Sequence, residues 1–350
     1  MIFVLRPSAT LSDRQRLVHE IEKLGARAHD VSEGSTLAVA TQSAPGASTS
    51  ALGALQALPF VERVLTIAKP YKLAAREAGK GRSVVSIGSV PVGGDSFAVI
   101  AGPCAVESEL QLRASALGAR DAGASILRGG AYKPRTSPYS FQGLGADGLK
   151  MLRDVGDELE MPIVTEALDP RDVELVARYA DALQIGSRNS QNFPLLSEAG
   201  RTGKPVMLKR GMAQTLKELL LAAEYVLRAA PAGAAASVIL CERGVRSFDG
   251  ETRNLLDLAS VPALQELCHL PVIVDPSHAT GRSELVAPMA KAAVAAGADG
   301  LMVEVHPDPL AARSDGRQAL RPSEFAALME KVERLLEIEG KQLATPLRRP

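Results

Sequence analysis

From Phe97 onward the chain repeats one pattern, in which a short apolar segment of strand length is followed by a longer amphipathic segment with helical spacing. The expected strands are Phe97 to Ile100, Ser125 to Leu127, Pro162 to Val164, Ala182 to Ile185, Val206 to Leu208, Val238 to Leu240, Val272 to Val274 and Leu301 to Val303. Eight strand–helix units fill the roughly 250 residues of a (β/α)8 barrel, whereas an open doubly wound sheet more often stops at about five to seven strands. The pattern therefore predicts an α/β fold, with a (β/α)8 TIM barrel over residues 96–340.

Residues 1–70 predict a separate and smaller domain. A strand at Ile2 to Leu5 precedes a helix that we expect to open at Ser12 or Asp13. Two strands, a short helix and a last strand at Val61 to Ile67 complete the domain. The order βαββαβ is that of a ferredoxin-like α+β sandwich.

Short connecting segments flank the predicted barrel. We expect residues 71–95 to form a linker and a β-hairpin that turns at Gly88 and Ser89. Residues 341–350 are expected to form a C-terminal tail.

Charge and composition argue against a nucleic-acid-binding, membrane-spanning or disulfide-rich protein. Forty Lys and Arg balance forty Asp and Glu, so no overall field favours a nucleic acid or an anionic membrane as a partner. The longest apolar runs are strand-sized, and the N-terminus lacks the order of a signal peptide, which predicts a soluble cytoplasmic protein. Cys104, Cys241 and Cys268 are too few and too far apart for a disulfide framework or a paired-cysteine zinc motif.

Almost every predicted strand ends in a side chain that is costly to bury. These side chains are Cys104, Arg128, Glu166, Arg188, Lys209, Glu242, Arg243, Asp275, His278 and Glu304. Because the active sites of such barrels lie at the carboxyl ends of the strands, we expect these groups to converge on one site. Left unpaired they would cost several kcal/mol each, so they should pair with one another, with a metal or with a charged ligand.

Four of the residues near strand ends offer a mixed set of metal ligands. Cys104, His278, Glu304 and Asp315 supply one thiolate, one imidazole and two carboxylates, a set that suits Mn²⁺, Fe²⁺, Co²⁺ or Zn²⁺. Asp275 is then a candidate partner that orients a ligand or pairs with a nearby cation. Taken one at a time, Cys104 also fits a small buried residue and His278 a helix cap.

The run from Leu127 to Ser137 carries three cations, two glycines and a Thr-Ser pair, with no acid to neutralise them. Arg and Lys offer charge-assisted donors and Gly lets the backbone approach an anion, so the run predicts a phosphate site. The alternative is a solvated basic turn.

The predicted ring holds more cations than one carboxylate needs. Arg128, Lys133, Arg188, Lys209 and Arg243 together call for at least two anionic groups in one pocket. In the structural alternative, Arg188 or Arg243 pairs with Glu166 or Glu242. Even then, some of the five cations would lack an acid partner.

Six long motifs resemble one enzyme family along the whole chain. The motifs are Ala101 to Ser108, Leu127 to Gly143, Gln184 to Asn189, Leu208 to Gly211, Cys241 to Gly244 and Val274 to His278. They look like 3-deoxy-D-arabino-heptulosonate 7-phosphate (DAHP) synthase, and the N-terminal domain resembles the ACT-type regulatory module of the type I-beta branch. The resemblance implies a metal-dependent, aldol-like condensation of phosphoenolpyruvate with erythrose 4-phosphate and water, with release of phosphate by C–O cleavage. This is the first step of the shikimate route to aromatic amino acids.

The resemblance also implies roles for single residues. Arg188, Lys209 and Arg243 would hold the phosphate of phosphoenolpyruvate, and Arg128 and Lys133 its carboxylate. Lys133, Pro134, Arg135 and Thr136 would hold erythrose 4-phosphate, the last two through its phosphate. Cys104, His278, Glu304 and Asp315 match the metal ligands, with Mn²⁺ the expected ion, and Asp275 and Asp315 also face the substrates. Lys133, Cys104 and His278 are the expected catalytic residues, and either Lys133 or a metal-bound water would protonate the new alkoxide.

Two other functions are compatible with the sequence. The first is 3-deoxy-D-manno-octulosonate 8-phosphate synthase, which uses arabinose 5-phosphate. Its characteristic loop reads closer to Lys-Ala-Asn-Arg-Ser than to the segment from Lys133 to Thr136 found here. The second is a non-catalytic barrel that senses a phosphorylated metabolite through its front domain.

For the front domain, the resemblance implies feedback inhibition by tyrosine or phenylalanine in a homotetramer. His29 and Ser32 are the candidate effector contacts. A solvated histidine at a strand end is the alternative for His29.

Overall fold

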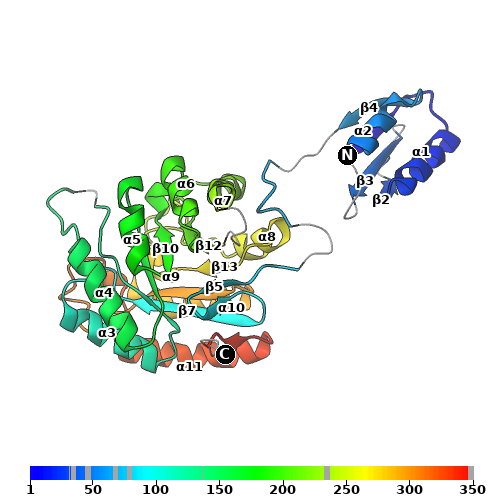
Figure 1. The fold of residues 1–350 in the computed structure, drawn as a ribbon. Coiled ribbons are helices and arrows are strands. Elements are labelled where there is room, and N and C mark those ends of the chain that lie inside the picture. Colours follow the sequence, from blue (N-terminus) through cyan, green and yellow to red (C-terminus); the bar gives the residue numbers. More distant parts are fainter. Residues whose placement is uncertain are drawn as a thin grey trace. The chain divides into compact units, whose positions relative to one another are not determined.

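The computed structural model describes residues 1–30, 32, 37–43, 49–65, 70–76, 81–135, 137–231 and 237–345. The chain divides into two compact units, Met1–Pro70 and Tyr71–Pro350 (Figure 1). Of the helices that the structure describes, none is long and apolar enough to cross a membrane.

The first unit is a four-stranded antiparallel sheet with the strand order β2-β3-β1-β4. Its elements are β1 (Ile2–Leu5), α1 (Leu11–Lys23), β2 (Ala26–Asp30), β3 (Ala38–Ser43), α2 (Thr49–Ala54), a short 3-10 turn (Leu55–Ala57) and β4 (Val61–Leu65). This connectivity and strand order are those of the predicted ferredoxin-like sandwich. Phe3, Leu17, Ile21 and Val39 form the centre of its core.

Helix α1 begins earlier than the sequence predicted. Thr10 is its N-cap, and its side chain accepts a hydrogen bond from the backbone of Asp13 while the Asp13 carboxylate accepts one from the backbone of Thr10. This reciprocal capping box satisfies two of the free N–H groups at the helix start. The prediction that Ser12 or Asp13 opens the helix was therefore wrong, because Asp13 serves the cap from the third helical position.

The second unit is the predicted closed barrel of eight parallel strands (Figure 1). The strands are β7 (Ser96–Gly102), β8 (Ile126–Arg128), β9 (Ile163–Glu166), β10 (Ala182–Ile185), β11 (Val206–Lys209), β12 (Val238–Glu242), β13 (Val272–Val274) and β14 (Gly300–Glu304). Each pairs with the next in parallel, and the pairing of β14 with β7 closes the ring. The main outer helices are α3 (Glu109–Asp121), α4 (Ala146–Glu158), α5 (Val173–Tyr179), α6 (Phe193–Arg201), α7 (Leu216–Ala229), α8 (Ser260–Leu267), α10 (Ser283–Ala295) and α11 (Pro322–Ile338).

Alternation along each strand separates two cores. Val99 and Leu183 face outward into the cluster shared with the helices, whereas Ile100, Met207 and Ile273 face the barrel interior. Strands buried on both sides are expected to be continuously apolar, which is why these segments stood out in the sequence.

The amino end of the barrel is filled by the predicted hairpin. Strands β5 (Val85–Ile87) and β6 (Val90–Val92) pair in an antiparallel manner, and their apolar side chains belong to the interior cluster of the barrel. The expected C-terminal tail also contributes here, because β15 (Gln342–Leu343) adds to β7 and Ala344 is buried in the same cluster. The tail prediction was therefore wrong for these residues. The open end is the one where the strands reach their carboxyl termini.

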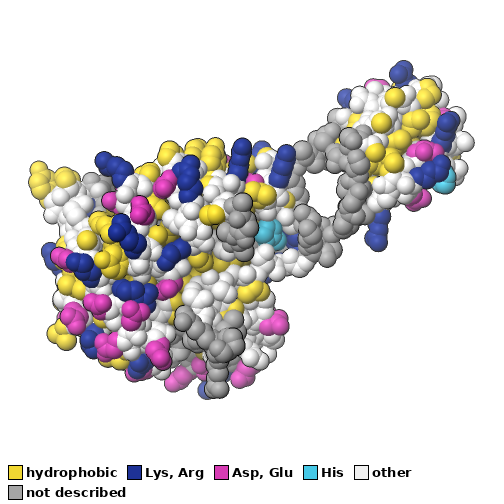
Figure 2. Space-filling model, in the orientation of Figure 1, with side chains coloured by type: hydrophobic (Ala, Val, Ile, Leu, Met, Phe, Trp, Pro, Cys, Tyr) yellow, Lys and Arg dark blue, Asp and Glu magenta, His cyan; other side chains and the backbone are white. Residues whose placement is uncertain are grey.

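On the face of the barrel unit shown in Figure 2, basic and acidic side chains are interspersed. No broad field of one sign covers that face, in keeping with the equal numbers of acidic and basic residues in the sequence. The concentration of charge that matters lies inside the open end of the barrel.

Candidate active site

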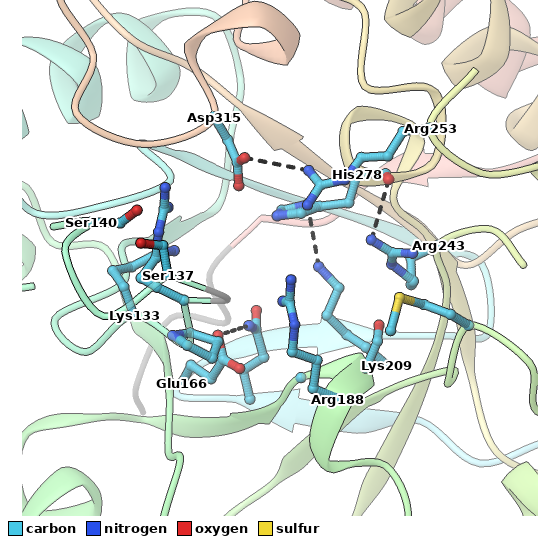
Figure 3. Close-up of a pocket in the computed structure, with 16 residues that line it drawn as sticks. Lys133, Ser137, Ser140, Glu166, Arg188, Lys209, Arg243, Arg253, His278 and Asp315 are labelled. Carbon is cyan, nitrogen blue, oxygen red and sulfur yellow. Dashed lines mark hydrogen bonds and ion pairs between the residues drawn. The ribbon is translucent and has the colours of Figure 1, made fainter. Parts of the chain in front are cut away.

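A cavity of about 290 Å³ opens at the carboxyl ends of the strands, and side chains from several strand exits point into it (Figure 3). The charged residues that line it are Lys133, Arg135, Glu166, Arg188, Lys209, Arg243, Arg253, His278 and Asp315. Of the strand-end groups named from the sequence, Glu166, Arg188, Lys209, Arg243 and His278 line this one cavity.

Four potential ligand atoms gather beside this cavity. One ligand atom from each of Cys104, His278, Glu304 and Asp315 lies within 4.8 Å of those of the other three. Cys104 Sγ is 3.3 Å from Asp315 Oδ2, and His278 Nε2 is 3.3 Å from Glu304 Oε1. The four residues come from the exits of β7, β13 and β14, so the barrel itself brings them together. A thiol, an imidazole and two carboxylates in one cluster, with Cys104 and Glu304 buried and the other two partly buried, fit a borderline divalent cation.

The imidazole of His278 is held in a fixed orientation. His278 lies on the short helix α9 (Pro276–Thr280), for which Asp275 is the N-cap and accepts a hydrogen bond from the backbone of His278 at 2.8 Å. The other oxygen of Asp275 accepts from His278 Nδ1 at 2.7 Å. Since Nδ1 carries the proton in that bond, Nε2 presents its lone pair to the cluster, as a metal-binding histidine requires.

The protonation states of the four candidate ligands follow from burial and charge. Burial raises the pKa of Asp315, but His278 and Arg253 outweigh it and hold the pKa at about 2. Burial likewise raises the pKa of Glu304, but His278 and Arg128 bring it below its usual value. Burial lowers the pKa of His278. For Cys104, burial and then the charge of Glu304 raise the pKa to about 12. Near neutral pH only the thiol therefore carries a proton that a metal would displace.

Two cations of the ring pair with acids of the same ring. Lys209 Nζ donates to Asp275 Oδ2, and Arg128 Nη1 donates to Glu304 Oε1 at 2.5 Å. Burial raises the pKa of Asp275, but His278 and Lys209 outweigh it and hold that pKa well below its usual range. Both ion pairs are buried, so neither charge is screened by water.

Other cations of the ring have no acid partner. Arg243 Nη2 donates to the carbonyl of His278 at 3.2 Å, and no carboxylate of the described residues pairs with it. Burial lowers the pKa of Arg243. Arg188 is exposed to the cavity and has no hydrogen-bond or ion-pair partner within the described part of the chain. Both Arg128 Nε and Arg243 Nε are buried without a partner in this part of the protein. A buried donor without an acceptor is costly, so the site favours an added anion.

The structural alternative for Arg188 and Arg243 is wrong. Glu242 is fully buried and pairs with Arg210 at 2.9 Å, and its other oxygen accepts from the backbone of Gly244 at 2.7 Å. Glu166 accepts from the Gln184 amide at 3.1 Å. The acids that sequence reasoning offered to the two arginines are thus engaged with other groups.

The basic run after β8 enters the site from the side of Cys104. Lys133 Nζ is buried and lies 2.8 Å from the carbonyl oxygen and 3.1 Å from Sγ of Cys104. Burial lowers its pKa, but the charge of Cys104 outweighs this and raises it. Arg135 Nη1 donates to Ser314 Oγ at 2.6 Å, and Pro134 lines the cavity. Thr136 lies outside the described residues.

Arg128 occupies a different place from the one expected. It is buried behind the cavity and is not among the described residues that line it, because its guanidinium pairs with Glu304 on β14, on the other side of β7. Sequence reasoning treated both groups as strand-end charges, but their separation of 176 positions carries no signal for the pair.

Three polar residues of the site went unnoticed in the sequence. Arg253, Ser314 and Gln318 contact candidate metal ligands or the basic run. Arg253 and Ser314 lie in loops and Gln318 in a short 3-10 helix (Gly316–Gln318), and none of these segments has apolar periodicity, so no pattern distinguishes the three from solvent-exposed polar residues.

Of the two candidate effector contacts in the first unit, the structure describes the side chain of Ser32 alone. Ser32 Oγ donates to Asp30 Oδ1 at 2.6 Å and accepts from the backbone of Ala38 at 3.0 Å, so its hydroxyl is engaged inside the unit. The side chain of His29 lies outside the described residues.

Comparison with known proteins agrees with the motifs. The sequence profile of the "DAHP synthetase I family" matches residues 75–338. A phospho-2-dehydro-3-deoxyheptonate aldolase of Thermotoga maritima is 45% identical over 340 residues, which are 97% of this chain and 99% of that protein. A 2-dehydro-3-deoxyphosphooctonate aldolase of Geotalea uraniireducens is 33% identical over 267 residues, 71% of this chain and 96% of that one.

Solved structures give the same relationship. The crystal structure of the DAHP synthase of Thermotoga maritima has a TM-score of 0.76 and 43% identity, and covers 98% of each chain. A truncated form of that organism's enzyme has a TM-score of 0.72 and 44% identity, and covers 78% of this chain and 99% of its own. The resemblance in the motifs thus extends over nearly the full length and into three dimensions, and this chain belongs to the DAHP synthetase I family.

Proposed function

We propose that this chain catalyses the condensation of phosphoenolpyruvate with erythrose 4-phosphate and water to give DAHP and phosphate. The observation that carries the proposal is the set of cations in the cavity that lack acid partners, above all Arg188 and Arg243. Two phosphorylated substrates repel each other in one pocket, and fixed cations that await anions offset that repulsion. Family membership supplies the reaction that fits this charge arrangement.

We assign the phosphate of phosphoenolpyruvate to Arg188, Lys209 and Arg243, which line the cavity together. Lys133, which lines the cavity, is assigned to its carboxylate. Arg128 is assigned to the same carboxylate from behind the cavity wall, where its Nε–H has no partner in the described protein, so a shift of this side chain would have to accompany binding. These contacts would hold the substrate by charge-assisted hydrogen bonds at both ends and fix which face of its double bond is presented.

Erythrose 4-phosphate is assigned to the loop that follows β8. Arg135 lines the cavity with Pro134 and is the nearest described candidate for the sugar phosphate, with Thr136 beside it in sequence. Ser314 holds the Arg135 guanidinium in place. Asp315 lines the same cavity from the side of the candidate metal ligands, whereas Asp275 is fully buried behind His278 and would act on the substrates through it.

Cys104, His278, Glu304 and Asp315 are proposed to hold a divalent cation, with Mn²⁺ as the expected ion and Fe²⁺, Co²⁺ or Zn²⁺ also compatible with the donor set. A metal bound there would supply Lewis-acid polarisation of the sugar aldehyde. We assign to Lys133, whose Nζ is 3.1 Å from Cys104 Sγ, the donation of the proton that the aldehyde oxygen takes up as the new C–C bond forms. Water adds at C2 of phosphoenolpyruvate, and phosphate leaves by C–O cleavage while Arg188, Lys209 and Arg243 bind it.

For the first unit, we propose a regulatory role in a cytoplasmic homotetramer, with tyrosine or phenylalanine as the effector. The ferredoxin-like strand order supports this, since it is the architecture that the resemblance implies for the regulatory module. His29 and Ser32 remain the candidate contacts. Ser32 would have to exchange its bonds to Asp30 and Ala38 for the effector. Inhibition curves with each amino acid and sedimentation of the protein test these assignments.

The experiment that tests the proposed reaction is phosphate release from phosphoenolpyruvate with Mn²⁺ present. Erythrose 4-phosphate is compared with arabinose 5-phosphate, each with and without EDTA. Release with the four-carbon sugar alone, abolished by EDTA and restored by Mn²⁺, is the expected result. A preference for arabinose 5-phosphate would assign the octulosonate reaction instead. No release with either sugar, despite binding of both substrates, would leave a sensor.

A further inference from the structure

One arginine at the rim of the cavity, Arg253, is linked to two of the four candidate metal ligands. Its Nη1 donates to Asp315 Oδ1 at 3.3 Å (Figure 3). The same Nη1 donates to Gln318 Oε1 at 3.0 Å. Gln318 is buried, and its Nε2 donates to Glu304 Oε2 at 2.6 Å. One guanidinium therefore reaches Asp315 directly and Glu304 through a single amide.

These bonds divide the two oxygens of Asp315 between separate tasks. Oδ1 accepts from Arg253, whereas Oδ2 accepts from Cys104 Sγ and faces the cluster of ligand atoms. A carboxylate held at one oxygen presents the other in a single direction, as partners behind metal ligands commonly arrange.

The backbone at Asp315 also depends on its surroundings. Asp315 has φ 53° and ψ 28°, in the left-handed region that residues other than glycine seldom occupy. Such a conformation persists when neighbouring contacts determine it. Contacts from Arg253 and Cys104 fix the side chain of this residue from two sides.

Arg253 is itself fastened to the helix that carries His278. Its backbone N–H donates to the carbonyl of Thr280 at 3.0 Å, and the N–H of Asn254 donates to Ala279 at 2.8 Å. A Cβ atom on Gly281 would lie 2.7 Å from Cβ of Arg253, which shows how closely the two segments approach. Arg253 thus connects helix α9 with the loop after β14.

We propose that Arg253 is a positioning residue that sets the metal affinity of the site by orienting Asp315 and, through Gln318, Glu304. The inference rests on the metal site of the proposed function and adds to it a residue outside the ligand set. Arg253 acts through the two carboxylates and contacts neither the metal nor the reacting atoms.

The test measures Mn²⁺ binding directly, by calorimetry and by the EPR signal of free Mn²⁺, on full-length protein stripped with EDTA. The variants are Arg253→Ala, Arg253→Lys and Gln318→Ala. Arg282→Ala is the matched control, because Arg282 is 41% exposed against 38% for Arg253 but pairs with Glu284, which is not a candidate ligand. Thermal unfolding of each metal-free variant shows whether the fold is intact.

We expect Arg253→Ala to bind Mn²⁺ about 10- to 100-fold more weakly than the unmodified protein, the loss usual for partners behind metal ligands. Arg253→Lys should bind Mn²⁺ more tightly than Arg253→Ala, because lysine keeps the positive charge. Gln318→Ala should also bind Mn²⁺ more weakly than the unmodified protein. The Mn²⁺ affinity of Arg282→Ala should stay within about twofold of that of the unmodified protein. At saturating Mn²⁺, kcat of Arg253→Ala should return towards that of the unmodified protein.

Unchanged Mn²⁺ affinity in a folded Arg253→Ala variant would overturn the inference. So would an altered KM for one substrate at constant Mn²⁺ affinity, because Arg253 would then belong to the substrate contacts. Failure of the unmodified protein to bind one Mn²⁺ is a separate outcome, which would remove the proposed metal site itself.

Discussion

The protonated thiol of Cys104 predicts that metal affinity depends on pH. Burial and the charge of Glu304 raise the pKa of Cys104 to about 12, whereas the pKa values of Asp315, Glu304 and His278 are all lowered. Because a metal binds the thiolate, binding near neutral pH should release one proton, and that proton should come from Cys104.

The magnitude follows from the gap between the pKa and the working pH. At pH 7.5 the gap to a pKa of about 12 is about 4.5 pH units, so forming the thiolate costs on the order of 6 kcal/mol of the binding free energy. The group loses a proton on binding, so affinity rises as pH rises towards 12. The apparent Kd for Mn²⁺ should fall about tenfold per pH unit, or about 100-fold between pH 6.5 and 8.5.

Calorimetric titration of the EDTA-stripped protein with Mn²⁺ measures both quantities. Repeating it in buffers with different ionisation enthalpies gives the number of protons released, and repeating it across the pH range gives the slope. Cys104→Ser is the control, because a serine hydroxyl keeps an oxygen at the site without ionising in this range. Its affinity should be lower and nearly independent of pH.

Two results would refute this reasoning. The first is a slope well below one for the unmodified protein, which would mean that Cys104 is already a thiolate or does not bind the metal. The second is a full slope in Cys104→Ser, which would place the released proton on another group.

Three further substitutions have outcomes that follow from single contacts. Arg243→Ala removes a buried guanidinium that lacks a carboxylate partner in the described protein. Steady-state kinetics should show a KM for phosphoenolpyruvate about 10- to 100-fold higher than that of the unmodified protein. Thermal unfolding should show no loss of stability, because no buried ion pair is broken. Asp275→Asn loosens the hold on His278 Nδ1, and calorimetry should show Mn²⁺ affinity lower by about 10- to 100-fold; an unchanged affinity contradicts the orienting role. Gly186→Ala would put a Cβ atom 2.0 Å from Glu166 Oε1, so the Glu166 carboxylate must move within the cavity. The value of kcat/KM should then fall by up to about 100-fold in a folded protein. Unchanged kinetics would show that this position of Glu166 is not needed for the reaction.

The barrel was predictable because burial on both faces makes each strand continuously apolar. The strands at Ala182–Ile185 and Val272–Val274 have the predicted bounds, and the others differ by only a few residues at an end. The short C-terminal strand at Gln342–Leu343 was missed, because two residues carry no periodic signal.

The sequence predicted those residues of the site that lie at or just after the ends of strands. Cys104 lies just after β7, Glu304 is the last residue of β14 and His278 lies on the short helix that follows β13, so the barrel topology alone brings them together. Asp315 follows in the loop after β14, and its place beside them depends on contacts that sequence reasoning did not supply.

Partner choice within the site was not predictable. Arg128 pairs with Glu304 over 176 positions, and Arg253 reaches Asp315 over 62. Such pairs depend on where loops fold back over the barrel mouth. Charge type alone does not reveal which cations keep a partner and which await a ligand.

The measurement that tests the site most directly is a crystal structure of the protein grown with Mn²⁺ and phosphoenolpyruvate, with data collected at the manganese absorption edge. We predict one anomalous peak among Cys104, His278, Glu304 and Asp315, with the substrate phosphate against Arg188 and Arg243. A fully loaded protein with its anomalous peak elsewhere, or with the phosphate away from both arginines, would contradict the assignment of this cavity as the site of condensation.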